Sequence, residues 1–142
     1  MRNEFMATAG LAFLLACTGG VAHAETVTYR AALSGANEIP ANDSGANGEA
    51  VAVYDTQTRM LEWTVSYSDT SGPLIGAHFH GPATESANAG VLVPMTVTES
   101  PIEGSAELSE EQAEFLEGGS IYVNLHTERF PGGELRGNLV AE

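Results

Sequence analysis

Three histidines lie in two short motifs that could together bind a metal ion. His78 and His80 belong to the segment AHFHGP (77–82), and His126 belongs to NLHT (124–127). Residues i and i+2 of a β-strand point to the same face and lie roughly 6.5 to 7 Å apart, so His78 and His80 can converge on one ion. Neutral imidazole is the commonest protein ligand for zinc and copper. With His126 from another strand, the motifs predict a copper or zinc site of three nitrogens.

Four other polar residues are candidates for orienting these histidines: Glu38, Asn124, Glu134 and Arg136. A carboxylate that accepts an imidazole N–H fixes the tautomer that binds metal, so Glu38 and Glu134 are candidates for this role. For Glu134 and Arg136, the favoured interpretation is that they are ordinary solvated strand residues. A separate alternative for the histidines is that His126 is a hydrogen-bonded surface residue, with His78 and His80 as its neighbours, and that no metal is bound.

The sequence offers little else for catalysis, and no residue is assigned a catalytic role. It has no Gly-x-Ser-x-Gly motif, no phosphate-binding glycine loop and no lysine, and Cys17 is its one cysteine. We therefore expect a protein that is not an enzyme.

Alternation of apolar and polar residues predicts the strands that position the histidines. In residues 74–80, Ile75, Ala77 and Phe79 share one face, and the two histidines share the other. In residues 120–126, His126 falls on the polar face as well. The three imidazoles should therefore lie on one polar face, near the rim of a sheet.

The remaining segments complete an all-β pattern. Ser109 and Gln112 form a capping box that opens a single short helix, which ends before Gly118. Seven or eight short strands with one helical turn predict an antiparallel, Greek-key-like β-sandwich. The other expected strands are 26–33, 49–55, 60–67, 91–97, 102–108 and 134–140, with Pro94 indicating an edge strand or a bulge and Trp63 assigned to the core.

The first 24 residues have the pattern of an export signal. An apolar run is followed by Ala22-His23-Ala24, the small-x-small form that signal peptidase accepts. We expect cleavage after Ala24, which leaves 25–142 as a single domain in the periplasm or outside the cell. A lipobox-like Leu14–Cys17 offers an alternative, with Cys17 as a lipid anchor, and a mass spectrum of the exported protein would separate the two. The apolar run is shorter than the roughly 20 residues that span a bilayer, so no transmembrane segment is expected.

The chain is strongly acidic. Its formal net charge is −14, and removal of Arg2 and Glu4 with the leader leaves four arginines against eighteen carboxylates. Such a surface repels nucleic acid and attracts cations, although acidic surfaces also serve solubility alone. We therefore expect no nucleic-acid partner.

Four ordered motifs give the chain a family resemblance. The segments LSGANEIP (33–40), AHFHGPA (77–83), GGSIYVNLHT (118–127) and PGGELRG (131–137) resemble the CHRD (chordin) domain over about residues 27–140. The resemblance implies a β-sandwich and leaves the biochemistry open. The chain is similar to the stand-alone exported form of the domain, so the growth-factor binding of chordin does not carry over.

Three functions remain open at this point. The first is an exported, non-enzymatic module that binds copper or zinc. The second is a structural or adhesive domain that binds an unidentified extracytoplasmic protein and no metal. The third is a redox enzyme similar to copper-zinc superoxide dismutases, which also pair a His-x-His strand with a late histidine. The third is disfavoured because an acidic chain repels the superoxide anion.

Overall fold

The computed structural model describes residues 19–20 and 23–142. Cys17 and most of the expected leader lie outside the described residues. Within the described part of the chain, no helix is long and apolar enough to cross a membrane.

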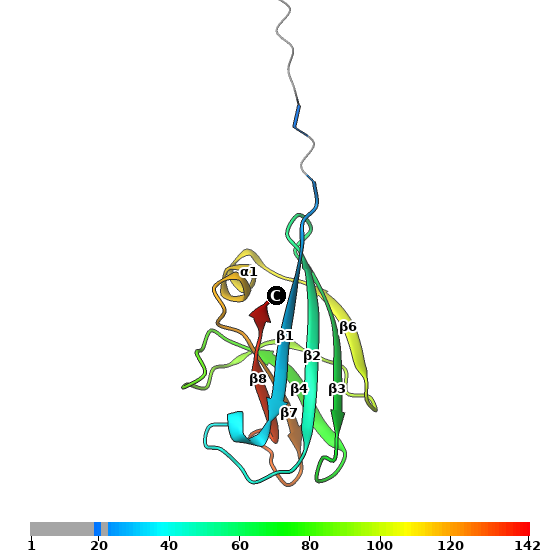
Figure 1. The fold of residues 1–142 in the computed structure, drawn as a ribbon, viewed down its shortest axis with the longest axis vertical. Coiled ribbons are helices and arrows are strands. Elements are labelled where there is room, and N and C mark those ends of the chain that lie inside the picture. The colour runs from blue at the N-terminus through cyan, green and yellow to red at the C-terminus, as the bar shows by residue number, and fades with distance from the viewer. Residues whose placement is uncertain (1–18, 21–22) are drawn as a thin grey trace, which may run out of the picture.

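Nine strands, one α-helix and one 3-10 turn make up the described part of the chain (Figure 1). The strands are β1 (Thr26–Ser34), β2 (Asn47–Asp55), β3 (Met60–Ser68), β4 (Leu74–His80), β5 (Val91–Pro94), β6 (Ile102–Glu107), β7 (Tyr122–Thr127), β8 (Leu135–Asn138) and β9 (Val140–Ala141). The 3-10 turn η1 is Gly35–Asn37, and the helix α1 is Glu110–Glu117. These elements confirm the predicted all-β class.

All strand pairs are antiparallel, and the strand order is β5-β4-β7-β8-β1-β2-β3-β6. In this order, three neighbouring pairs of strands are not consecutive in the chain: β4 with β7, β8 with β1, and β3 with β6. These pairs give the sheet its Greek-key-like connectivity. The halves β5-β4-β7-β8 and β1-β2-β3-β6 are continuous at β1 and β8, so the sandwich approaches a closed barrel. As predicted for a strand that contains Pro94, β5 is at an edge of the sheet.

Two details of the predicted strands are wrong. Residues 134–140 form two strands instead of one, because the chain leaves β7 after Asn138 and pairs Val140 with Arg30 of β1. Ile75 is 54% exposed instead of facing the core. A register irregularity between Leu74 and Gly76 breaks the alternation, so that Leu74 is buried in its place.

The core lies between the two halves of the sandwich. The rings of Trp63 from β3 and Phe79 from β4 meet edge to face, with centroids 5.1 Å apart. Such aromatic contacts add to the free energy gained from burying their large apolar surface.

The helix α1 begins with the predicted capping box, in which Ser109 and Gln112 each accept a backbone N–H from the other. Figure 1 shows α1 at one end of the sandwich, with the cyan loop that contains η1 at the opposite end.

The outer face of β4, β7 and β8 carries a layer of polar residues. In the register, His78 of β4 lies opposite Asn124 of β7, which lies opposite Arg136 of β8. Two residues further along β4, on the same face, His80 lies opposite Tyr122 of β7. Of these five residues only His78 is more than one-tenth exposed. This face of the sheet therefore holds a second, polar interior in addition to the apolar core.

Candidate metal centre

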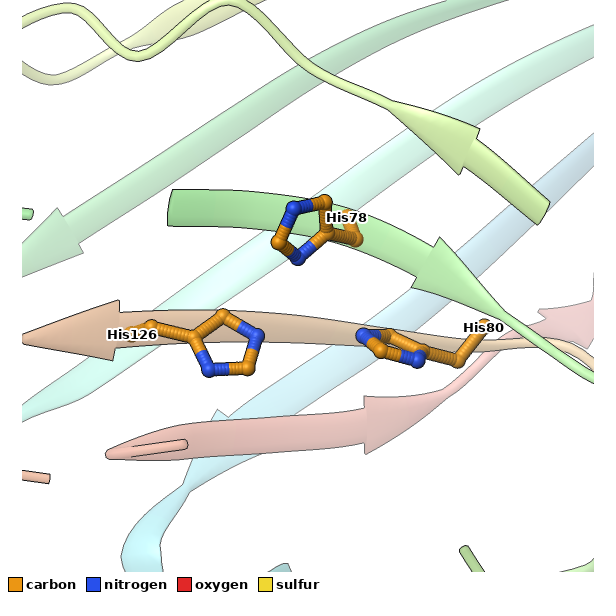
Figure 2. Close-up of side chains that lie close together, drawn as sticks. All are labelled: His78, His80 and His126. Atoms are coloured by element: carbon orange, nitrogen blue, oxygen red, sulfur yellow. The ribbon is translucent and has the colours of Figure 1, made fainter. Parts of the chain in front are cut away.

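The three predicted histidines meet on this outer face. Figure 2 shows His78 and His80 on β4 and His126 on β7, with their rings turned toward a common point. The ring centroids are 5.4 Å apart for His78 and His80, 5.0 Å for His78 and His126, and 5.9 Å for His80 and His126. One ring nitrogen from each residue lies within 4.8 Å of the others. Two nitrogens bound to one tetrahedral zinc ion at about 2.0–2.1 Å are about 3.4 Å apart, so the nitrogens would have to approach one another by up to about 1.4 Å to close the site.

Backbone carbonyls fix the tautomers of two of the imidazoles. Nδ1 of His80 lies 3.0 Å from the carbonyl oxygen of Ala89, and Nδ1 of His126 lies 3.0 Å from that of Pro131. Because a carbonyl oxygen can only accept, each Nδ1 carries the proton and each Nε2 carries a free lone pair. These are the nitrogens that could bind an ion.

The same lone pairs have no hydrogen-bond partner inside the protein. Among the described residues, the buried side-chain atoms without a partner are Nε2 of His80, Nε2 of His126, Nδ1 of His78 and the indole nitrogen of Trp63. Native proteins pair almost all buried polar atoms, and an unpaired one costs about 1–3 kcal/mol. Three such nitrogens in one cluster make this face the candidate site for a ligand.

Burial keeps these imidazoles neutral. Loss of solvent lowers the pKa of His78, His80 and His126 below the ordinary histidine value, and mutual repulsion lowers that of His78 further. In His80 and His126, the carbonyls of Ala89 and Pro131 oppose this shift without reversing it. A neutral imidazole is the form that binds metal, so all three are ready at neutral pH.

Gly76 makes room for the histidines to converge. It lies directly opposite His126 in the register, on the same face as His78. A Cβ atom at this position would lie 3.1 Å from Cε1 of His78 and 3.6 Å from Cδ2 of His126. Alternation along the strand places Gly76 on the face of the histidines, but the sequence interpretation gave it no role, although a glycine two residues before a His-x-His strand pair is a visible signal.

Glu38 lies in the same polar layer but does not contact a histidine. Its carboxylate accepts a hydrogen bond from Nδ2 of Asn124, which also donates to the carbonyl oxygen of Leu135 at 2.9 Å. Gly133, whose φ is +131°, passes so close that a Cβ would lie 2.5 Å from Glu38 Oε1. Burial raises the pKa of Glu38 to about 7, against the opposing effects of Asn124 and Arg136.

Glu134 is fully buried and saturated with hydrogen bonds, so its interpretation as a solvated strand residue is wrong. It accepts from the hydroxyls of Ser44 (2.7 Å), Ser71 (2.8 Å) and Thr127 (2.6 Å), and from the backbone N–H of Ser71 (2.9 Å). Burial would raise its pKa, but these donors together lower it. The carboxylates therefore do not orient the imidazoles, and carbonyls hold His80 and His126 because the loops that cover this face bring backbone to them.

Arg136 is also buried, at 1% exposure, and was likewise wrongly interpreted as solvated. Its guanidinium donates to the side chain of Asn88 (2.8 Å) and to the carbonyls of Thr84 (3.1 Å) and Ala87 (2.7 Å). These bonds hold the loop 81–90, whose Ala89 carbonyl accepts from His80. Arg136 thus positions His80 through the backbone of that loop.

A stack of three side chains joins Arg136 to the histidines. The guanidinium carbon lies 3.7 Å from the centre of the Tyr122 ring, and that ring is parallel to the His80 imidazole within 4° at a centroid distance of 5.0 Å. Tyr122 comes from β7, the strand between those that carry Arg136 and His80. Its hydroxyl accepts from the N–H of Ala89 at 3.0 Å. His80 is therefore held by stacking and by Ala89.

Comparison with known proteins identifies the domain. The CHRD domain matches residues 29–139, which is most of the chain. No curated protein and no solved structure gives a significant match.

Proposed function

The chain belongs to the CHRD domain family, and we propose that it is a metal-binding module that holds one copper or zinc ion on His78, His80 and His126. The observation that carries this proposal is the set of three unpaired, buried ring nitrogens that face one another within 4.8 Å. A tautomer fixed on two of the three ligands lowers the entropy lost on binding.

The arrangement favours binding over turnover. His80 is only 8% exposed, and its imidazole is held on one face by Tyr122 and at Nδ1 by Ala89. No group in the described residues is placed as an acid or base beside the three nitrogens, because Glu38 and Glu134 are engaged elsewhere. A rigid nitrogen face of this kind suits the storage, buffering or delivery of an ion, and the export-signal pattern of the sequence supports a role outside the cytoplasm.

Metal titration of the purified protein, produced without a histidine tag, tests the proposal. We expect one Cu or Zn ion to bind per chain. Calorimetry, together with metal analysis after gel filtration, measures this stoichiometry. Replacement of one ligand, as in His126→Gln, is expected to lower the affinity at least ~100-fold, since loss of a ligand exceeds the 10–100-fold cost of losing a residue that only orients one. Absence of stoichiometric binding in the wild type would reject the proposal and favour an adhesive domain.

The control addresses the acidic surface, which attracts cations without a site. Glu62 is an exposed carboxylate on β3, in the other half of the sandwich. Glu62→Gln removes one negative charge and should leave the stoichiometry and affinity unchanged. Equal losses in Glu62→Gln and His126→Gln would mean that the titration reports non-specific attraction.

Gly76→Ala provides a second test that changes no ligand. The added methyl group would press on His78 at 3.1 Å and displace its ring by a few tenths of an ångström. Because ligand placement of this precision controls affinity, we expect metal binding to weaken about tenfold while the metal-free protein keeps its stability within about 1 kcal/mol. Calorimetric titration and urea unfolding measure the two effects, and unchanged metal affinity would show that the ion does not bind at Nδ1 of His78.

A further inference from the structure

The residues around the three histidines affect which ionic charge the site can accommodate. This inference rests on the proposed metal-binding function. All three ligands are neutral imidazoles. In the described residues, the hydrogen-bond acceptors of His80 and His126 are the uncharged carbonyls of Ala89 and Pro131. Metal sites commonly use a carboxylate at this position, which reduces the net charge of the complex. Here the full charge of the ion would remain in the site.

A buried positive charge already lies next to these ligands. Arg136 is 1% exposed, and its hydrogen bonds go to two carbonyls and to the amide of Asn88. The salt bridges of the described residues involve Arg30 and Arg59 and not Arg136. One aromatic ring, that of Tyr122, separates the Arg136 guanidinium from the His80 imidazole.

Nearby carboxylates do not balance this charge by direct contact. Glu38 accepts from Asn124, and its pKa of about 7 leaves it partly protonated at neutral pH. Glu134 is surrounded by donors from Ser44, Ser71 and Thr127. The exposed carboxylates elsewhere are screened by water and salt within a distance of about 8–10 Å. Among the described residues, Arg136 is therefore the charged group stacked beside the histidines, and neither Glu38 nor Glu134 forms an ion pair with it.

These conditions penalise a divalent ion more than a monovalent one. The repulsion from Arg136 doubles when the ionic charge doubles, and the cost of burying an uncompensated charge rises even more steeply. Copper(II) also prefers four or more ligands in a tetragonal arrangement, whereas the described site offers three nitrogens. From these observations we propose that the site selects a monovalent d10 ion, copper(I), over zinc(II) and copper(II).

Competition experiments on the wild-type protein test this selectivity. Copper(I) and zinc(II) are both d10 ions, so their comparison excludes a geometric preference from d-electrons, and the Arg136 variants below test the contribution of charge. Under anaerobic conditions, copper(I) is titrated against bicinchoninate, and zinc(II) against a chromophoric zinc chelator. We expect copper(I) to bind about 100-fold more tightly than zinc(II), and bound copper to have a higher reduction potential than copper in free imidazole.

The outcomes separate this inference from the proposed function. Stoichiometric binding of zinc(II) or copper(II) that is as tight as that of copper(I) would overturn the selectivity and leave the metal-binding function intact. Failure of all three ions to bind would overturn both. A reduction potential below that of the free imidazole complex would also contradict the inference, because it would show that the site favours copper(II).

A pair of variants tests the role of the Arg136 charge. Arg136→Lys and Arg136→Gln both lose the planar, five-donor fork, so they share the loss of packing around the loop 81–90. Only Arg136→Gln loses the charge. We expect its preference for copper(I) over zinc(II) to be about tenfold smaller than that of Arg136→Lys, with a lower reduction potential of the bound copper. Equal preferences in the two variants would show that the Arg136 charge does not set the selectivity, and the wild-type measurements remain valid if either variant folds poorly.

Discussion

Glu38→Gln is expected to stabilise the metal-free protein by about 3 kcal/mol at pH 8 and to leave its stability nearly unchanged at pH 4. The reason is the burial of the Glu38 carboxyl group, which raises its pKa from 4.5 to about 7. The unfolded chain releases this proton near pH 4.5, while the folded protein keeps it until about pH 7. Stability is therefore lost as the pH rises through this window.

The glutamine variant removes this loss because it stays neutral at every pH. Its side-chain oxygen can still accept the hydrogen bond from Asn124, so little packing is lost. Urea unfolding in the presence of a chelator, at pH 4, 6 and 8, measures the difference. Glu62→Gln, an exposed carboxylate on β3, is the matched control and should show no such trend. If Glu38→Gln were the less stable protein at pH 8, Glu38 would have to be ionised and stabilising in the folded state.

Glu134→Gln is expected to have the opposite effect, destabilising the protein by about 3–5 kcal/mol at pH 7. The Glu134 carboxylate accepts from three hydroxyls and one backbone N–H, and its side chain has no solvent exposure. A glutamine would place an NH₂ group against donors and leave some of them unpaired. The cost of unpaired buried groups therefore adds to the loss of the hydrogen bonds to a charged acceptor.

The dependence on pH also distinguishes Glu134 from Glu38. Its folded pKa lies below 4.5, so its contribution is present above the unfolded pKa and is lost as the pH falls through the folded value. The difference between wild type and Glu134→Gln should then shrink at strongly acidic pH, as followed by urea unfolding. Thr127→Val removes one donor and is expected to cost only about 1–2 kcal/mol at pH 7. A Glu134→Gln variant as stable as Thr127→Val would show that the carboxylate is not ionised.

These two carboxylates show where the chemical roles of residues could not be predicted from sequence. Both were candidates for binding a histidine N–H, and Glu134 was also considered a solvated residue. The structure buries both, because residues far away in the chain supply their partners: Asn124 for Glu38, and Ser44 and Ser71 for Glu134. Alternation along a strand indicates which face a side chain takes, but it carries no information about what covers that face.

The sequence by itself determined most of the strands, the capped helix and the common face of His78, His80 and His126. These features depend on the two-residue period of a strand and on contacts within one turn of a helix, so a short segment specifies them. Only the tertiary structure decided that His126 pairs with Gly76, that carbonyls of Ala89 and Pro131 fix the imidazoles, and that Arg136 is buried behind Tyr122. Register and burial between distant segments arise from the packing of the whole chain, which no local pattern contains.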